Sequence, residues 1–419
     1  MTNNSKASLK MPLFLWALTT SFFAFQFILR MSAGILRESI MQKFNLDTIA
    51  FGSVAGYYYL GYSSMQIPVG IMLDRYNFKY VTAGAIFIAM VGTLTFVFSS
   101  NVESVIFGRF LIGVGSAAGI LSVAKIIQLY FPPRLHAIMM GFTFSLGLTG
   151  AVFGGLPMKV IFNEVGYNTS FISLAIVASV IALAILFVRD KNVARNEHIE
   201  EGKNLSLYEI IKLVLNPTIL FIGVCGGFMV GSLEGFADVW AMPFFNQIYG
   251  FSENQSIFLA TTVFTGMIFG GPLLGYFERL FGSVSFMIFA TAIVTSVIFC
   301  SLFYFGSMSY AISLSLMFFM GVLCCYQVLV FTMVGDMVGK SETAIAVSII
   351  NCINMSFGQL FHKFISYIMQ SGWDGSLNAN GGPVYTHQGY VVGLSIIPIF
   401  AVIGGVGFLY LAIKHKKRK

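Results

Sequence analysis

One long apolar run of this sequence ends with PVGIMLDR, residues 68–75, and another ends with PLLGYFER, residues 272–279. The proline, the acidic residue and the arginine recur at one shared offset, from position 68 to 272, from 74 to 278 and from 75 to 279. Self-similarity at a fixed offset indicates an internal duplication. We therefore expect two related halves, and residues at equivalent positions are expected to face each other across the interface between them.

The composition limits the class of protein. The 419 residues are 57% hydrophobic and only 10% charged, whereas an ordinary soluble domain is about 25% charged. A water-soluble fold of this length would lack the polar residues to cover so much apolar surface, so a soluble enzyme is excluded. The five Cys all lie inside apolar runs, where we expect buried hydrophobic side chains and no disulfide framework. A polytopic membrane protein remains.

Twelve apolar runs are long enough to cross a bilayer, since a spanning helix needs roughly 20 residues. The predicted fold is all-α, with two pseudo-symmetric six-helix bundles at residues 1–188 and 215–419, joined by a cytoplasmic central loop at 189–214. The runs are Met11–Leu36, Thr48–Leu73, Tyr80–Ser99, Val105–Tyr130, Ala137–Phe162, Phe171–Val188, Pro217–Val239, Ser256–Phe277, Val284–Phe305, Tyr310–Val334, Thr343–Gln370 and Tyr390–Ile413.

The basic residues predict the orientation. An even number of spans places both termini on one side, and most Lys and Arg residues fall in the connections on that side. The opposite side carries few, namely Arg37, Lys43 and Lys159. This bias assigns both termini to the cytoplasm, and we expect a monomer in a bacterial cytoplasmic membrane. The net charge of +7 is attributed to the same bias and not to nucleic-acid binding, and the basic tail His415–Lys419 is expected to contact anionic lipid.

The loop after the second run carries a recognisable motif. Gly70, Asp74, Arg75 and Lys79 are spaced as in the G-x-x-x-D-R-x-G-x-K/R loop of the major facilitator superfamily, which this segment resembles. The sequence departs from that pattern at Asn77, where Gly is usual, but Asn also tolerates a left-handed backbone conformation. The turn is therefore expected to be preserved.

Two further segments are similar to the same superfamily. Residues 109–117, RFLIGVGSA, resemble its R-x-x-x-G-x-G-x-A pattern, and the glycines at 141–155 resemble its glycine-rich fifth helix. The resemblance covers the whole chain and implies a transporter that works by alternating access. It also implies a cytoplasmic gate, in which Asp74 lies against the start of the eleventh span. The gating residues are then Gly70, Asp74, Arg75, Lys79, Arg109, Glu278 and Arg279.

Ionisable residues inside apolar runs are costly, so they are candidates for the functional site. Arg30 in the first run and Glu234 in the seventh are related by the offset that relates the two halves. Gln26 lies one helical turn before Arg30, and Asp238 one turn after Glu234. A guanidinium that faces a carboxylate suits a zwitterion, whose carboxylate and ammonium each find a partner. The alternative is a direct salt bridge between the halves, and the two roles can alternate.

Other polar residues in the runs are candidates for lining the substrate cavity. They are Lys125, Tyr326, Gln327, Asn351 and Asn354. Some of them could instead lie at the membrane interface or bond neighbouring helices. Proton coupling is the expected energy source, because the sequence contains no energy-coupling domain. Glu234 and Asp238 are the candidates for carrying the proton. The sequence gives no reason to expect a cofactor or a metal.

The expected function is secondary active transport of a small polar solute, with a proton or another ion as the coupling partner. Residues 27–32, 57–75 and 130–133 are similar to bacterial relatives of the lysosomal dipeptide transporter group, which implies an amino acid or a short peptide as cargo. One alternative is an exchanger of organic anions or phosphate esters that uses Arg30, Arg37 and Lys125. A second alternative is an efflux pump for apolar drugs.

Overall fold

The computed structural model describes residues 10–188, 206–305, 308–339, 342–378 and 382–416, and these ranges contain helices and one isolated β-bridge. The expected loop residues 189–205 and the tail after residue 416 lie outside them. The first half contains α1 (Lys10–Ile35), α2 (Arg37–Phe44), α3 (Thr48–Arg75), α4 (Phe78–Val97), α5 (Val102–Ser116), α6 (Ala118–Tyr130), α7 (Pro133–Phe153), α8 (Leu156–Val165) and α9 (Tyr167–Phe187). The second half contains α11 (Leu207–Val214), α12 (Pro217–Met229), the π-helix η1 (Gly231–Trp240), α13 (Ala241–Tyr249), α14 (Glu253–Phe281), α15 (Val284–Tyr304), α16 (Tyr310–Cys324), α17 (Tyr326–Met337), α18 (Thr343–Ser371), α19 (His387–Leu394) and α20 (Ile396–Lys416).

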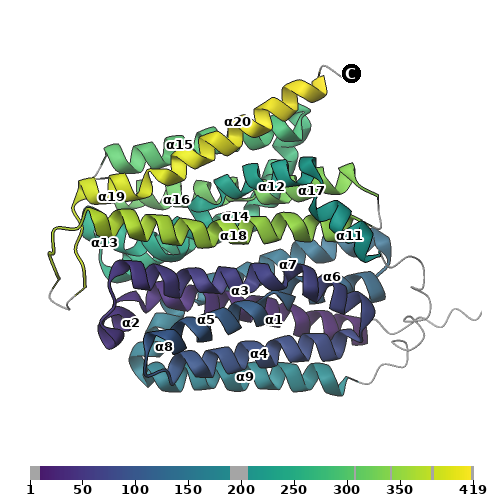
Figure 1. Cartoon of the computed structure of the whole chain (residues 1–419), viewed down its shortest axis with the longest axis horizontal. Coiled ribbons are helices and arrows are strands. Elements are labelled where there is room, and N and C mark those ends of the chain that lie inside the picture. The colour runs from purple at the N-terminus through teal and green to yellow at the C-terminus, as the bar shows by residue number, and fades with distance from the viewer. Residues whose placement is uncertain (1–9, 189–205, 306–307, 340–341, 379–381, 417–419) are drawn as a thin grey trace, which may run out of the picture.

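The helices form two bundles that lie against each other, one above the other in Figure 1. The interface between the halves is built mainly by α3 and α18, which run side by side through the middle of the molecule, and by α7 with α14. We call the end of the bundle where α1 begins and α20 ends the terminus side, and the opposite end the far side. The central site lies at this interface, about midway between the two sides.

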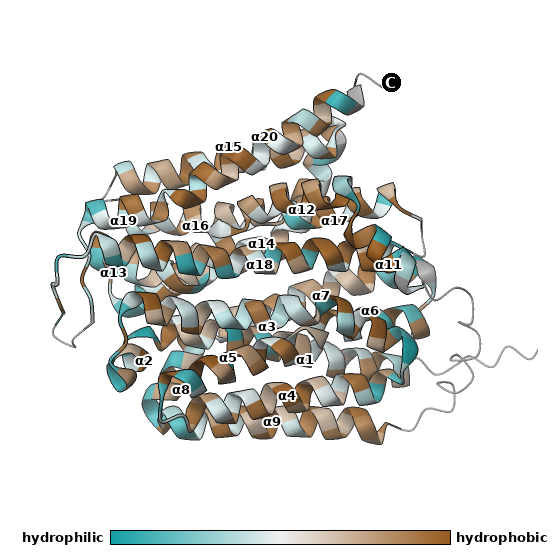
Figure 2. Ribbon diagram, viewed as in Figure 1, coloured by the Kyte–Doolittle hydropathy of each residue, from teal (hydrophilic) through white to brown (hydrophobic). Residues whose placement is uncertain are grey.

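The helices have the lengths and hydropathy of membrane spans. Eleven helical stretches of the described residues are long and apolar enough to cross a bilayer. Figure 2 shows hydrophilic residues mainly at the two ends of the helices and hydrophobic ones along their middles. The remaining span is α3, which has 28 residues but is too polar to meet the same criterion. Its polar side chains face the interior, because Tyr58, Tyr59, Ser63 and Gln66 are all buried.

Several spans differ from the continuous helices that the sequence predicts. The fourth span breaks at Ala117 and the tenth at Cys325, and each break residue lies between two helices. The seventh span extends beyond its expected end at Val239, because η1 continues into α13 as far as Tyr249. The expected central loop also contains a helix, α11, which begins with a capping box between Ser206 and Glu209.

Candidate functional site at the interface between the halves

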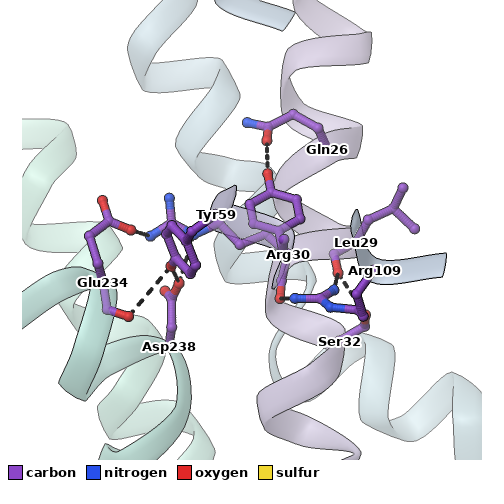
Figure 3. Close-up of polar contacts among 9 residues, drawn as sticks. Gln26, Leu29, Arg30, Ser32, Tyr59, Arg109, Glu234 and Asp238 are labelled. Carbon is purple, nitrogen blue, oxygen red and sulfur yellow. Dashed lines mark hydrogen bonds and ion pairs between the residues drawn. The ribbon is translucent and has the colours of Figure 1, made fainter. Parts of the chain in front are cut away.

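A buried ion pair joins the two halves at the centre of the molecule (Figure 3). The Arg30 side chain of α1 donates from Nη2 to the Glu234 carboxylate of η1 and from Nε to Asp238 Oδ2, at 2.7 Å in the second case. Arg30, Glu234 and Asp238 are 7%, 1% and 5% exposed. One guanidinium is therefore shared by two carboxylates.

Two tyrosines of α3 extend this cluster. The Tyr59 hydroxyl donates to Asp238 Oδ2, so this carboxylate oxygen accepts from both Tyr59 and Arg30. The guanidinium carbon of Arg30 also lies 5.2 Å from the centroid of the Tyr59 ring, a cation–π distance. The neighbouring Tyr58 donates from its hydroxyl to Gln26 Oε1 at 2.6 Å. The cluster therefore draws its groups from α1, α3 and η1.

Arg109 of α5 supports the backbone of this cluster. Its guanidinium donates to the carbonyl oxygen of Leu29 at 2.8 Å, and also to those of Arg30 and Val54 at 3.4 Å. The resemblance implied a gating role for Arg109, but the structure places this residue beside Arg30 and not at the loop that contains Asp74. It links α1 to α3 and so holds the segment from which Arg30 projects.

The π-helix positions the two carboxylates. A π-helix winds more loosely than an α-helix and is often found at functional sites. In η1 it brings Glu234 and Asp238, four residues apart, onto the one guanidinium of Arg30. The backbones also approach closely here, because a Cβ atom added at Gly34 of α1 would lie 2.0 Å from the Asp238 carbonyl oxygen. Glycine at position 34 is therefore needed for η1 to reach α1.

The other polar candidates line the interface between this cluster and the terminus side. Asn351 of α18 donates from Nδ2 to Gln66 Oε1 of α3 at 3.1 Å, which links the halves. Tyr326 donates from its hydroxyl to the Gly226 carbonyl oxygen at 2.9 Å within the second half. Among the residues that the structure describes, neither amide atom of the fully buried Asn354 has a hydrogen-bond partner, and Gln327 Nε2 has none either. Such unpaired groups are rare in a folded interior, and they suit a site that binds a polar solute.

The predicted gate residues lie at the terminus side. Lys125 Nζ of α6 lies 3.2 Å from Asp74 Oδ1, so Asp74 pairs within its own half. Both residues line a cleft that also includes the first turns of α18, so Asp74 lies near the eleventh span, as expected, but no hydrogen bond is found between them in the described ranges. Lys79 Nζ donates to the Val188 carbonyl oxygen.

The remaining members of the gate set make fewer contacts. Gly70 borders the same cleft, and a Cβ atom there would meet nothing within 4 Å. Arg75 is exposed and Glu278 half-buried. The side chain of Arg279 lies outside what the structure describes.

Polar contacts join the halves on the far side, whereas a cleft separates them on the terminus side. Each of these contacts pairs a residue of the first half with one of the second. The Thr48 hydroxyl bonds to the Tyr385 hydroxyl, and the Thr48 backbone N–H donates to Gln370 Oε1 at 3.3 Å. Asn378 Nδ2 donates to Glu38 Oε1 at 3.1 Å, and Lys159 Nζ lies 2.5 Å from Glu253 Oε2. The structure is therefore shut on the far side.

Two central residues, Tyr59 and His362, lie outside the principal site candidates, although the sequence marks His362 as one of the polar residues of the eleventh span that could line the cavity. Tyr59 belongs to the run of three tyrosines at 57–59, for which packing was the favoured interpretation. His362 of α18 is buried, its ring centroid lies 5.2 Å from that of Tyr59, and neither ring nitrogen has a hydrogen-bond partner in the described part of the chain. The low hydropathy of α3 was the available signal, since a polar span must turn its polar face inward.

The bundles, the buried charges and the cleft together define a polytopic membrane transporter. The profile of the Major Facilitator Superfamily matches residues 18–361, and the chain belongs to this family. It is an integral multi-pass membrane protein and not an enzyme.

Relatives and solved structures agree with this assignment. The chain is 24% identical over 302 residues to the uncharacterized transporter YybO of Bacillus subtilis, which covers 66% of this chain and 68% of the relative. It is 25% identical over 154 residues to the 4-hydroxybenzoate transporter PcaK of Pseudomonas aeruginosa, covering 37% of this chain and about a third (34%) of that protein. It is 24% identical over 288 residues to the probable galactarate/D-glucarate transporter GudP of Escherichia coli, covering 61% and 64% of the two chains.

Among solved structures, a bacterial homolog of the human lysosomal transporter Spinster, in an inward-facing and occupied conformation, superposes with a TM-score of 0.74. The match covers 96% of both chains at 16% sequence identity. The nucleoside transporter NupG superposes with a TM-score of 0.70 over 94% of this chain at 12% identity. These likenesses show the fold.

Proposed function

We propose that this transporter carries a small solute with a carboxylate and an ammonium group, such as an amino acid or a short peptide, by alternating access. The observation that supports this proposal is the Arg30–Glu234–Asp238 bridge, since a zwitterion can replace both sides of it. The substrate carboxylate takes the place of Glu234 on the guanidinium, and the substrate ammonium takes the place of Arg30 on a carboxylate. Binding then exchanges one set of ion pairs for another and leaves few charges unpaired.

The bridge also locks the two halves together, so the same exchange is expected to permit movement. Arg30 belongs to the first half, and both carboxylates belong to the second. Bringing the halves apart without substrate would leave three charged groups to be solvated at once. A substrate with a differential affinity for the open and closed arrangements shifts the equilibrium between them. Arg30 and Glu234 therefore alternate between two roles: they bind the substrate in one state and hold the two halves together in the other.

Proton coupling follows from the charges of the cluster. Two carboxylates and one guanidinium remain one positive charge short when a zwitterion binds. An unpaired buried carboxylate is costly, and a proton removes that cost. Glu234 and Asp238 are the proposed proton carriers. Uptake should therefore make the medium on the side of origin more alkaline, and Asp238→Asn should reduce this signal per molecule transported.

An organic acid is the second candidate cargo, because relatives are described as transporters of 4-hydroxybenzoate and of galactarate/D-glucarate. An acid of this kind would need Arg30 but no carboxylate partner. Glu234 would then not bind the cargo, and would only hold the halves together and carry the proton. The two candidates therefore differ in their dependence on Glu234. For both we place the terminus side in the cytoplasm of a bacterial inner membrane and treat the protein as a monomer.

The test combines ligand binding with two charge-removing variants. Purified protein is melted in detergent with L-alanyl-L-alanine, single amino acids, 4-hydroxybenzoate, galactarate and a sugar phosphate, because a ligand of the folded state raises the melting temperature. Uptake of the stabilising compounds into proteoliposomes is then measured for wild type, Glu234→Gln and Arg30→Lys. Glu103→Gln, which removes an exposed carboxylate from the first turn of α5, is the matched control.

The zwitterion proposal expects the dipeptide or amino acids to stabilise the protein, and both cluster variants to lose uptake. If only the organic acids stabilise the protein, and they also stabilise Glu234→Gln, the cargo is an organic acid. If apolar compounds alone are moved and Arg30→Lys is as active as wild type, neither carboxylate-based proposal holds.

A further inference from the structure

A second buried guanidinium lies at the same interface, closer to the far side. Arg37 is the first residue of α2, seven residues after Arg30, and it is 1% exposed. Its guanidinium carbon lies 5.8 Å from the ring centroid of Phe51 on α3 and 5.3 Å from that of Trp240 at the end of η1. Phe51 belongs to the first half and Trp240 to the second, so Arg37 is held between them.

The hydrogen-bond donors around Arg37 lack acceptors. Within the described ranges, Nε and Nη2 of Arg37 have no hydrogen-bond partner, and the indole Nε1 of Trp240, whose ring Arg37 contacts, has none either. A guanidinium and an indole N–H can only donate, so the group that would satisfy them must be an acceptor. The two aromatic rings stabilise the positive charge by about 1–2 kcal/mol. They leave the N–H groups unpaired.

Three polar side chains on the far side of the molecule already make hydrogen bonds to other groups. Glu38 Oε1 accepts from Asn378 Nδ2 at 3.1 Å. Tyr390 donates its hydroxyl to Gln247 Oε1 at 3.0 Å, and the Tyr385 hydroxyl is bonded to the Thr48 hydroxyl.

The surroundings of the two arginines differ in one respect. Arg30 lies against an aromatic ring and bonds to two carboxylates of the protein. Arg37 lies against two aromatic rings, and among the described residues it has no carboxylate within ion-pair distance. Arg30 and Arg37 are thus two buried arginines at one interface, and Arg37 lies nearer the far side. Among the described residues, only Arg30 of the two bonds to carboxylates of the protein. Together they form a path for an anion that arrives from the far side.

We propose that Arg37, with the indole N–H of Trp240, is an outer binding site for the carboxylate of the substrate. The site opens to solvent when the halves part on the far side, and the carboxylate then moves on to Arg30. Seven residues of helix correspond to about 10 Å, so the substrate passes from one arginine to the other in sequence. This inference rests on the proposed function, because it takes a carboxylate-bearing cargo for granted.

The test measures transport from each side separately. Uptake into intact cells samples the far side, and uptake into inside-out membrane vesicles samples the terminus side. The probes are L-alanyl-L-alanine, 4-hydroxybenzoate and galactarate. The variants are Arg37→Gln, Arg37→Lys and Trp240→Phe, the last of which removes the N–H group but keeps an aromatic ring. Lys43→Gln removes an exposed positive charge from the same helix and is the matched control.

Arg37→Gln is expected to raise KM for uptake into cells about tenfold, the effect of losing roughly one charged hydrogen-bond interaction. Trp240→Phe should raise the same KM about twofold to threefold, since a neutral hydrogen bond is weaker. Arg37→Lys should be intermediate, because it keeps the charge and loses the planar fork. KM in inside-out vesicles should not change for any of them, and Lys43→Gln should match wild type in both assays.

Two outcomes overturn the inference, and they are distinguishable. If Arg37→Gln and Trp240→Phe lower only the maximal rate and leave KM unchanged from both sides, Arg37 is a closure contact and not a binding site. If wild type takes up none of the three probes, the proposed function fails and this inference fails with it. Should Arg37→Gln not fold, as judged by its melting curve, Trp240→Phe and Arg37→Lys decide the question by the same KM comparison.

Discussion

Removing the charge of Arg30 should destabilise the protein strongly, and removing Glu234 as well should add little or no further loss. In Arg30→Met, two carboxylates that are 1% and 5% exposed lose the one cation that pairs with them among the described residues. Loss of one partner from a buried ion pair costs about 3–5 kcal/mol. Glu234→Gln is milder, at about 1–2 kcal/mol, because Arg30 keeps its 2.7 Å bond to Asp238.

The double variant leaves a single buried carboxylate, Asp238, which still accepts from the Tyr59 hydroxyl. Its total cost should therefore fall short of the sum of the two single variants by about 2 kcal/mol, a coupling typical of residues in direct contact. The measurement is the free energy of unfolding in mixed detergent micelles for wild type, both single variants and the double variant. A second cycle that combines Arg30→Met with the exposed Glu103→Gln should show no coupling. If the Arg30 and Glu234 losses add to within about 0.5 kcal/mol, the ion pair in the structure does not hold the halves together.

Two further predictions concern the contact between the halves. Gly34→Ala should lower both transport and the melting temperature, because its Cβ atom would lie 2.0 Å from the Asp238 carbonyl oxygen. Gly84→Ala is the control and should leave transport at the wild-type level, since its Cβ atom would meet no described atom within 4 Å. Equal effects of the two variants would contradict the close approach of α1 and η1. Lys159 and Glu253, 2.5 Å apart across the far side, should support reversible inhibition when both are replaced by Cys and joined with a short bifunctional thiol reagent. Full transport in the cross-linked state would show that the far side need not open.

The pairing of Arg30 with Glu234 is accessible to sequence reasoning for a physical reason. A buried charge in a membrane is costly, so two unlike charges at equivalent positions of duplicated halves are expected to meet at the interface. The structure brings them into contact, 204 residues apart in the chain. The pattern could not decide whether they pair directly or through a substrate, since both arrangements use the same residues at the same depth.

The contribution of Asp238 and Tyr59 was harder to predict. Residues four apart lie nearly in line on a helix, so Asp238 was expected on the same face as Glu234, but nothing in the pattern indicated that one guanidinium bonds to both carboxylates or that they lie on a π-helix. Tyr59 lies in a run of three tyrosines, and which of them faces the cluster depends on the rotation of α3 about its own axis. For Arg109 a motif suggested a gating role, and the packing places this residue beside Arg30, a position that the motif did not indicate.

The arrangement of charges along the interface also explains how the two halves can be held together and still move apart. On the far side the halves are held by several separate polar contacts, and at the centre by a bridge that a zwitterion can replace. At the terminus side Asp74 bonds to Lys125 of its own half, so this pair does not have to break when the cleft widens. In the proposed function, opening the far side requires the central bridge to be exchanged for bonds to the substrate. Movement is then coupled to occupancy because the same three side chains join the halves and bind the cargo.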